Sequence, residues 1–311
     1  MTRRDVLKTV AAVGMAGPLA AAEPKRLPIV LMSKFMQFFD VKRMGEMTAQ
    51  LGFDGVDLCV RKGAHVLPER VADDLPAAVE VIRKAGSDVG MITSDIVDAR
   101  TPHAETVLKT AAELGIRRYR WGSFRYDLSK PIASQLESFK PRVKELAALN
   151  RDLGMTAMYH PHSGPQQVGA GIWDVWYLIK DLSPEQVSFN FDIGHAVVEG
   201  GYGGWQHTSR LALPLSRGLA IKDFVFGRDK KGEWEPLWKP LGEGMVDFRQ
   251  FLKLVREADF SGPVQLHYEY PLGGIDTGSS KPTIELDVAW KAMRRDLALL
   301  REWMKAAGLP A

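Results

Sequence analysis

The sequence predicts one α/β domain, a (β/α)₈ barrel, on three observations. The chain has 311 residues, which is more than most single domains have but suits one barrel of about 250 residues. From residue 27 onward, short apolar runs alternate with longer amphipathic stretches in eight strand-then-helix units. No GxGxxG motif follows the first apolar run, which argues against an open dinucleotide-binding sheet.

The expected strands are short apolar runs, as is typical of strands in a buried parallel sheet. They cover 27–32, 55–60, 88–93, 117–122, 155–160, 187–192, 218–223 and 262–269. Apolar residues at helical spacing predict helices at 41–52, 75–86, 104–115, 142–154, 248–260 and 288–308. Several of these stretches end at a glycine (Gly52, Gly86, Gly115 and Gly154), the usual residue after the last helical turn.

The composition excludes several classes of protein. Hydrophobic residues make up 45% of the chain and charged residues 25%, as in ordinary globular proteins. After the first twenty residues no apolar stretch reaches 18 residues, so we expect no membrane-spanning body. The single cysteine, Cys59, excludes an intramolecular disulfide and a cysteine-rich zinc site.

The first 22 residues have the pattern of a twin-arginine export signal. Arg3 and Arg4 precede an apolar run from Val10 to Ala22, and small residues at 20–22 suit cleavage before Glu23. The alternative is a frayed amphipathic helix. Removal of residues 1–22 lowers the formal net charge from +3 to +1, so the alkaline pI does not indicate nucleic-acid binding. We expect a periplasmic or otherwise exported protein with a barrel over 23–311, which uses the twin-arginine machinery as a partner.

Polar residues gather where the expected strands end. In a barrel of this kind, functional groups lie at the C-terminal ends of the strands and in the loops that follow. The residues at these positions are Asp57, Arg61, His65, Ser94, Asp95, Arg120, Trp121, His160, His162, Asp192, His195, Lys222, Asp223, His267 and Glu269. They include five of the seven histidines of the chain, and this concentration indicates a site at the C-terminal mouth.

Several of these residues belong to motifs that resemble a known superfamily. The segments "GFDGVDL", "YHPHSG", "FDIGHA", "IKDF" and the stretch 241–270 together resemble the xylose-isomerase-like barrels. The resemblance is to the sugar phosphate isomerase/epimerase group, which is related to ketose 3-epimerases and inosose dehydratases. It covers roughly residues 28–305 and implies the same barrel fold.

The resemblance also implies a divalent-metal site with ligands from strands five to eight. By position, His160 replaces the family's first glutamate, Asp192 matches its aspartate, and Ala220 replaces its histidine. Glu269 or His267 takes the place of the last glutamate. The implied ligands are His160, Asp192 and Glu269, around Mn²⁺, Mg²⁺, Co²⁺ or Zn²⁺. A compensating fourth ligand could come from His195, His162 or His267.

Each of these residues also has a purely structural interpretation. A histidine at a strand end can cap a loop, an aspartate there can hold a turn, and Lys222 with Asp223 can form a surface ion pair. The aromatic residues of "IWDVWYLI" have helical spacing and favour packing over a sugar platform. Trp205, Trp234 and Trp238 are expected in loops, where they could form a plate for a sugar ring.

The resemblance implies proton chemistry beside a carbonyl. We expect Glu269 to be the base, Lys222 to stabilise the oxyanion, and His195 or His162 to be the acid. Neither an activated serine nor an activated cysteine is apparent. The residues expected to bind substrate are Arg61, His65, His162, His267 and Asp223. Because phosphorylated sugars are chiefly cytosolic, the export signal favours a non-phosphorylated keto-sugar or cyclitol.

Three other functions stay open at this point. The same groups could serve a keto-sugar dehydratase or lyase, since only the destination of the second proton differs. The changed ligands also suit a non-catalytic periplasmic sugar-binding barrel. A DNA-repair endonuclease is disfavoured, because its three-zinc site needs more ligands and the near-neutral mature chain lacks a basic footprint.

Overall fold

The computed structural model describes residues 26–310. The expected export signal at 1–22 lies outside this range and stays a prediction. Among the described residues, no helix combines the length and the apolar content that a bilayer crossing requires.

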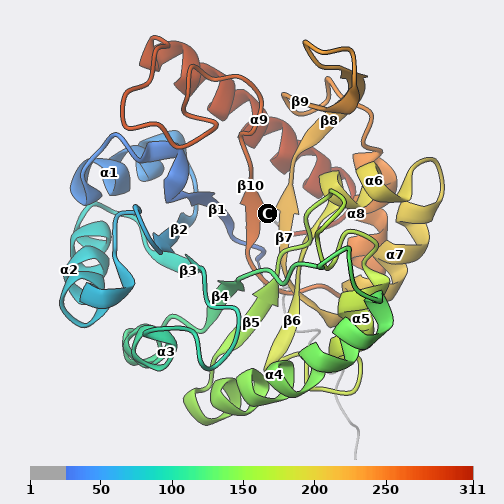
Figure 1. Ribbon diagram of the computed structural model, residues 1–311. Coiled ribbons are helices and arrows are strands. Elements are labelled where there is room, and N and C mark those ends of the chain that lie inside the picture. Colours follow the sequence, from blue (N-terminus) through green and yellow to red (C-terminus); the bar gives the residue numbers. More distant parts are fainter. Residues whose placement is uncertain (1–25, 311) are drawn as a thin grey trace, which may run out of the picture.

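Eight parallel strands close into a barrel in the order β1-β10-β7-β6-β5-β4-β3-β2 (Figure 1). The strands are β1 (Ile29–Met32), β2 (Gly55–Val60), β3 (Val89–Ser94), β4 (Arg118–Trp121), β5 (Thr156–Tyr159), β6 (Val187–Asp192), β7 (Ser216–Ile221) and β10 (Val264–Leu266). The predicted barrel is therefore confirmed. Several strand ends differ from expectation, and three of them bear on the site: β5 stops before His160, β7 before Lys222 and β10 before His267.

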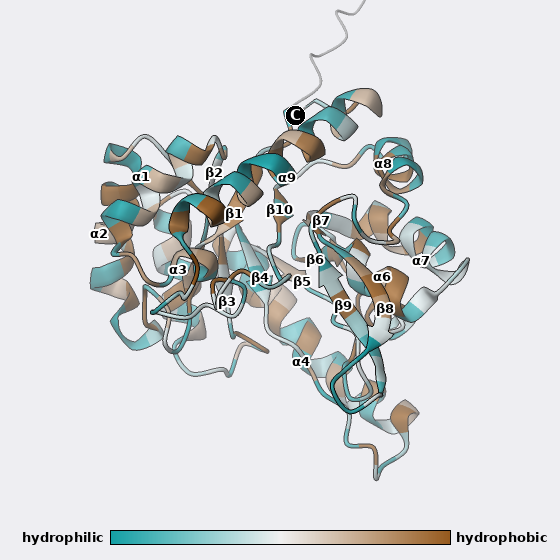
Figure 2. Cartoon of the chain, turned by 90° about the horizontal axis from the view of Figure 1, so that it is seen from above, coloured by the Kyte–Doolittle hydropathy of each residue, from teal (hydrophilic) through white to brown (hydrophobic). Residues whose placement is uncertain are grey.

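Helices surround the barrel and cover its outer face (Figure 1). They are α1 (Val41–Leu51), α2 (Val71–Lys84), α3 (Ala104–Glu113), α4 (Ile132–Leu153), α5 (Trp173–Ile179), α6 (Ile193–Gly200), α7 (Gly204–Ala212), α8 (Phe248–Glu257) and α9 (Leu286–Ala306), with 3₁₀ turns η1 (Ser33–Met36), η2 (Pro68–Arg70) and η3 (Leu213–Leu215). Hydrophilic and hydrophobic residues alternate along α1, α2 and α9 in Figure 2, as expected for helices that bury one face.

The barrel interior is layered from apolar to polar. Val30, Met91 and Met158 form a small separate apolar cluster. Side chains alternate between the two faces of a strand, so Met158 and the residue two positions later face the same way. That residue is His160, directly after the end of β5. The polar residues of the expected site therefore lie above the apolar layer, at the C-terminal mouth.

Helices α6 and α7 and one hairpin were not predicted from the sequence. Strands β8 (Asp223–Arg228) and β9 (Trp234–Lys239) form an antiparallel hairpin of their own, outside the barrel sheet. The expectation of loops at three tryptophans was therefore wrong. Trp234 and Trp238 belong to β9, and Trp205 is buried in α7. The hairpin follows β7 directly and carries Trp238 back towards the mouth.

Candidate active site

Asp192 lies at the centre of a buried polar cluster. It is the last residue of β6, and its Oδ1 accepts the backbone N–H of His195 at 3.0 Å, so it caps the start of α6. Its Oδ2 lies 3.3 Å from His160 Nε2 and 3.3 Å from Lys222 Nζ. The "FDIGHA" motif thus places the Asp192 carboxylate between the His160 ring and the Lys222 ammonium group. In the neighbouring strand, the residue level with Asp192 is Ala220.

Lys222 is only 2% exposed and faces this cluster. Its Nζ donates to Glu269 Oε2 at 2.8 Å, lies 2.7 Å from His195 Nε2, and stands 4.1 Å from the centre of the Trp238 ring. Gly194 makes room for it, because a Cβ at that position would come within 2.7 Å of Lys222 Cγ. The alternative of a surface ion pair with the next residue does not hold.

Asp223 is not brought into the cluster. Its two carboxylate oxygens accept the backbone N–H groups of Phe224, Gly242, Gly244 and Val246 at 2.9 to 3.1 Å. It therefore fixes the loop that follows the hairpin, and its oxygens are occupied. The expectation that Asp223 binds substrate is therefore corrected. Successive residues at a strand end point to opposite sides, so Asp223 faces away from the cluster that Lys222 faces.

A chain of side-chain hydrogen bonds crosses the barrel beneath the cluster and orients His160. Thr93 donates to Asp57, Gln265 Nε2 donates to Asp57 Oδ2, and Asn190 Nδ2 donates to Gln265 Oε1. The same Asn190 nitrogen lies 3.2 Å from His160 Nδ1. These residues come from β2, β3, β6 and β10, so the interior of the barrel positions the ring from below.

His267 is buried, and neither ring nitrogen has a hydrogen-bond partner among the described residues. A buried polar atom without a partner is costly, so the site is suited to a group that would use it. His160, Asp192 and His267 each offer a ligand atom, all within 4.8 Å of one another. Glu269 instead bonds Lys222. Of the two alternatives for the last ligand, this geometry favours His267.

The histidines of the cluster are neutral at physiological pH. Burial and then the charge of Arg120 hold the pKa of His160 well below its usual value, while burial and Lys222 do the same for the pKa of His195. Burial lowers the pKa of His162 and of His267 to about 3. Neutral imidazole is the form that binds metals. A protonated His195 or His162 is therefore a poor candidate for the catalytic acid.

The two central carboxylates are ionised. Burial is the largest single effect and raises the pKa of Glu269, but Lys222 and the other neighbouring groups together outweigh it and hold the value well below the usual range. The same balance lowers the pKa of Asp192. The Glu269 side chain is 24% exposed whereas that of Asp192 is 0%. Glu269 is thus the carboxylate that an incoming molecule meets.

The other expected site residues divide into two groups. His162 joins the cluster, with its ring centre 4.7 Å from that of His160 and its Nε2 3.0 Å from Arg120 Nη2. Arg61 directly follows β2 at the same mouth. His65 is not brought in, because its Nε2 lies 3.2 Å from the carbonyl oxygen of Phe39.

Lys34 is a residue of the site that sequence reasoning missed. It follows β1 closely, and its charge lowers the pKa of Glu269. It could have been found, since the same strand-end rule applies to the first strand. Trp238 was named from the sequence as part of a plate for a sugar ring. It stands 5.1 Å from the His195 ring and covers Lys222, a position that depends on the hairpin and not on a loop.

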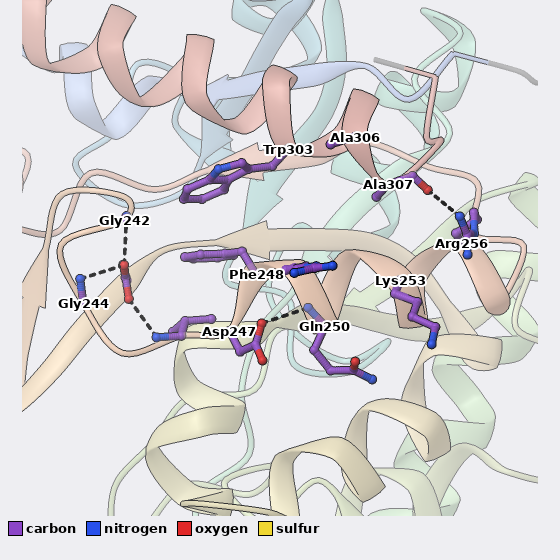
Figure 3. Close-up of a pocket in the computed structure, with 13 residues that line it drawn as sticks. Gly242, Gly244, Asp247, Phe248, Gln250, Lys253, Arg256, Trp303, Ala306 and Ala307 are labelled. Carbon is purple, nitrogen blue, oxygen red and sulfur yellow. Dashed lines mark hydrogen bonds between the residues drawn. The ribbon is translucent and has the colours of Figure 1, made fainter.

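A groove of about 910 Å³ lies elsewhere, beside α8 and α9 (Figure 3). Trp303 stacks on Phe248 along it, with ring centres 5.0 Å apart, and Arg256 donates to the Ala307 carbonyl. Apart from Asp223, none of the strand-end residues lines it. The groove therefore does not compete with the mouth as the candidate active site.

The model of the xylose isomerase-like TIM barrel family matches residues 46–303. The chain belongs to this family. This match confirms the family resemblance seen in the sequence. None of the curated proteins matches the sequence significantly.

Solved structures of similar fold include several barrels of this family. A D-tagatose 3-epimerase-like protein is 14% identical, with 91% of this chain and 98% of that chain covered and a TM-score of 0.65. The 3-keto-D-glucoside 4-epimerase from E. coli is 14% identical, with 89% of this chain and 100% of that chain covered and a TM-score of 0.62. A xylose isomerase-like TIM barrel protein from Mycobacterium smegmatis in complex with magnesium is 18% identical, with 87% of this chain and 98% of that chain covered and a TM-score of 0.59. At these identities the likeness shows the fold alone.

Proposed function

We propose that this barrel is a carbohydrate isomerase or epimerase acting on a non-phosphorylated keto-sugar or cyclitol. The proposed reaction removes a proton next to a carbonyl, with the help of a divalent metal. One observation carries the proposal. An ionised Glu269 stands 2.8 Å from the ammonium of Lys222 at the open edge of a buried cluster. The sugar epimerases among the structures of similar fold support the same class of reaction.

Glu269 is the proposed proton acceptor. Its lowered pKa keeps it ionised, but it also makes the carboxylate a weak base. The substrate proton must therefore be acidified by stabilising the negative charge that develops on the neighbouring oxygen. A preorganised cation in a site without bulk water is effective in this role.

Lys222 is the proposed oxyanion stabiliser and proton donor. Its Nζ contacts Asp192, His195 and Glu269 at 2.7 to 3.3 Å, so its position is fixed before substrate arrives. The Nδ1 of His195 lies 2.8 Å from Ser163 Oγ. Both ring nitrogens are thus engaged, and His195 acts as a positioning residue for the ammonium, in place of the acid expected from the sequence.

His160, Asp192 and His267 are the residues that would hold the metal. Two nitrogen donors and one oxygen donor suit Zn²⁺, Mn²⁺ or Co²⁺ better than Mg²⁺, which prefers oxygen ligands. The bound ion would polarise the substrate carbonyl. His267 supports this assignment, because neither of its buried ring nitrogens has a hydrogen-bond partner within the described part of the chain.

The test is hydrogen exchange from solvent into substrate. Keto-sugars are incubated in D₂O with the protein and Mn²⁺, Co²⁺ or Zn²⁺, and deuterium next to the carbonyl is followed by NMR. The Glu269→Gln variant keeps the shape and removes the base, so we expect exchange to be lost while sugar binding remains. Glu302→Gln on the exposed side of α9 is the matched control and should exchange like the wild type.

The products separate the remaining alternatives. An epimer or isomer with deuterium supports the proposal, whereas an unsaturated product indicates the dehydratase or lyase reaction of the same groups. Exchange that is undiminished in Glu269→Gln would move the base to another residue. Binding without exchange, with every metal, would leave a sugar-binding barrel.

A further inference from the structure

Three cationic side chains at the barrel mouth have no carboxylate partner within the described residues. Lys34 lies in η1 just after β1, Arg61 directly follows β2, and Arg120 belongs to β4. Among residues 26–310, no carboxylate oxygen lies within 4.0 Å of a side-chain nitrogen of these three residues. All three are only partly exposed.

These cations share one region of the mouth. In the closed sheet β1 lies between β2 and β10, which places Lys34 beside the segment that carries Glu269 and Arg61 one strand further away. Tyr119 bonds Asn150 of α4, so its neighbour Arg120 faces the interior. Burial and then Arg61 lower the pKa of Arg120, which shows that the two charges are close.

Three carboxylates of the mouth face four cations. Asp192 and Glu269 pair with Lys222. Asp57 accepts hydrogen bonds from Thr93 and Gln265, and its charge also acts on Arg120 and Arg61. Since the histidines are neutral, these groups keep an excess of one positive charge on the side of Lys34, Arg61 and Arg120.

Holding like charges together in a partly buried site opposes folding. An anionic ligand would offset that cost. A guanidinium offers two parallel N–H donors to a carboxylate or phosphate. The contact of Arg120 Nη2 with His162 leaves the remaining donors of that guanidinium free in the mouth.

We propose that the substrate carries an anionic group, bound by Arg120, Arg61 and Lys34 on the β1–β4 side of the mouth, beside the His160–Asp192–His267 cluster. This deepens the proposed function and rests on it. The chemistry required is a planar or tetrahedral oxyanion at the end of a keto-sugar. Because the proposed substrate is non-phosphorylated, we commit to a carboxylate, that is, a keto-sugar acid.

The experiment compares three probes of one carbon skeleton by isothermal titration. These are D-fructuronate, neutral D-fructose and D-fructose 6-phosphate. We expect the carboxylate to bind more tightly than the neutral sugar by roughly tenfold or more, as charge-assisted hydrogen bonds allow. The preference should shrink as salt is raised. Tighter binding of the phosphate than of the carboxylate would overturn the choice of a sugar acid.

Variants assign the effect to these residues. Arg61→Gln and Arg120→Gln should each reduce the affinity for D-fructuronate by roughly tenfold and leave the weak binding of D-fructose unchanged. Arg249→Gln, on the exposed surface of α8, is the charge-matched control. If Arg120→Gln unfolds at a lower temperature, Arg61→Gln and Lys34→Gln carry the test. Equal affinity of wild type and variants for the acid would refute the proposal.

The two proposals fail in distinguishable ways. Arginine-dependent binding of D-fructuronate without deuterium exchange would keep the anion site and remove the isomerase function. Exchange into neutral D-fructose that is as fast as into D-fructuronate, in wild type and in Arg61→Gln alike, would keep the function and remove the anion site.

Discussion

Replacement of Asp57 by asparagine should stabilise the protein at neutral pH and not at acidic pH. Asp57 is fully buried in the barrel, where it accepts hydrogen bonds from Thr93 and Gln265. Burial raises the pKa of its carboxyl to about 6, against 3.8 for the ordinary group, even though the bonds from Thr93 and Gln265 lower it. An asparagine can accept from Gln265 and donate to the Thr93 hydroxyl, so no partner is lost.

The magnitude follows from the difference between the two pKa values. The shift is about two units, and each unit corresponds to about 1.4 kcal/mol. The folded state holds the proton more tightly than the unfolded chain, so wild-type stability falls as pH rises from about 4 to about 6. The loss is complete above pH ~6 and amounts to ~3 kcal/mol. An amide at this position has no proton to lose, so the Asp57→Asn variant lacks this decline.

The assay is urea unfolding of wild type and Asp57→Asn at four pH values between about 4.5 and about 7.5, which bracket the upper part of this decline. Between the lowest and the highest of these pH values, the difference in unfolding free energy should grow in favour of the variant by ~2 kcal/mol, because the first ~1 kcal/mol of the decline lies below pH ~4.5. Asp73→Asn on the exposed face of α2 is the matched control and should show no such trend. A difference that stays constant across this range would falsify the raised pKa of Asp57.

Two further predictions concern the cluster itself. Lys222→Met should lower the unfolding free energy at neutral pH by ~3–5 kcal/mol, because it leaves Asp192 and Glu269 without their counter-charge. Urea unfolding measures this difference. The double variant Lys222→Met with Glu269→Gln should recover part of the lost stability. If the double variant is as unstable as Lys222→Met alone, the ion pair between Lys222 and Glu269 is contradicted. His267→Ala should weaken Zn²⁺ or Mn²⁺ binding by roughly tenfold or more in metal titrations. His65→Ala should leave metal binding unchanged, and equal affinity in His267→Ala would remove His267 from the ligand set.

The barrel could be predicted because its strands leave a strong local signal. A parallel strand buried on both faces is a continuous apolar run, and a helix that ends at glycine marks where the next strand begins. The β8–β9 hairpin leaves no such signal. Its residues are mostly half-exposed, and its turn at 229–233 is rich in charged residues and glycine, as loops are.

The candidate site was predicted in outline for a related reason. Strand ends of one barrel converge, so Asp192, His160 and Lys222 could be placed together from their positions alone. The direction in which a side chain points is harder to infer from sequence than the position of its residue at a strand end. Asp223 turns away from its neighbour into the hairpin loop, and His65 turns to a backbone carbonyl. Which side chain pairs with which depends on packing between distant strands, and a single sequence does not specify it.

The β8–β9 hairpin reaches the site but is structurally independent of the barrel sheet. It shares no strand pairing with that sheet in the described chain, yet its Trp238 ring lies over the Lys222 ammonium group. Substitutions along 225–239 can therefore reshape the entrance without disturbing barrel closure, and insertions near residue 231 should be tolerated. Evolved or engineered variants can therefore change substrate preference through the β8–β9 hairpin alone, while the barrel interior that sets the chemistry is unchanged.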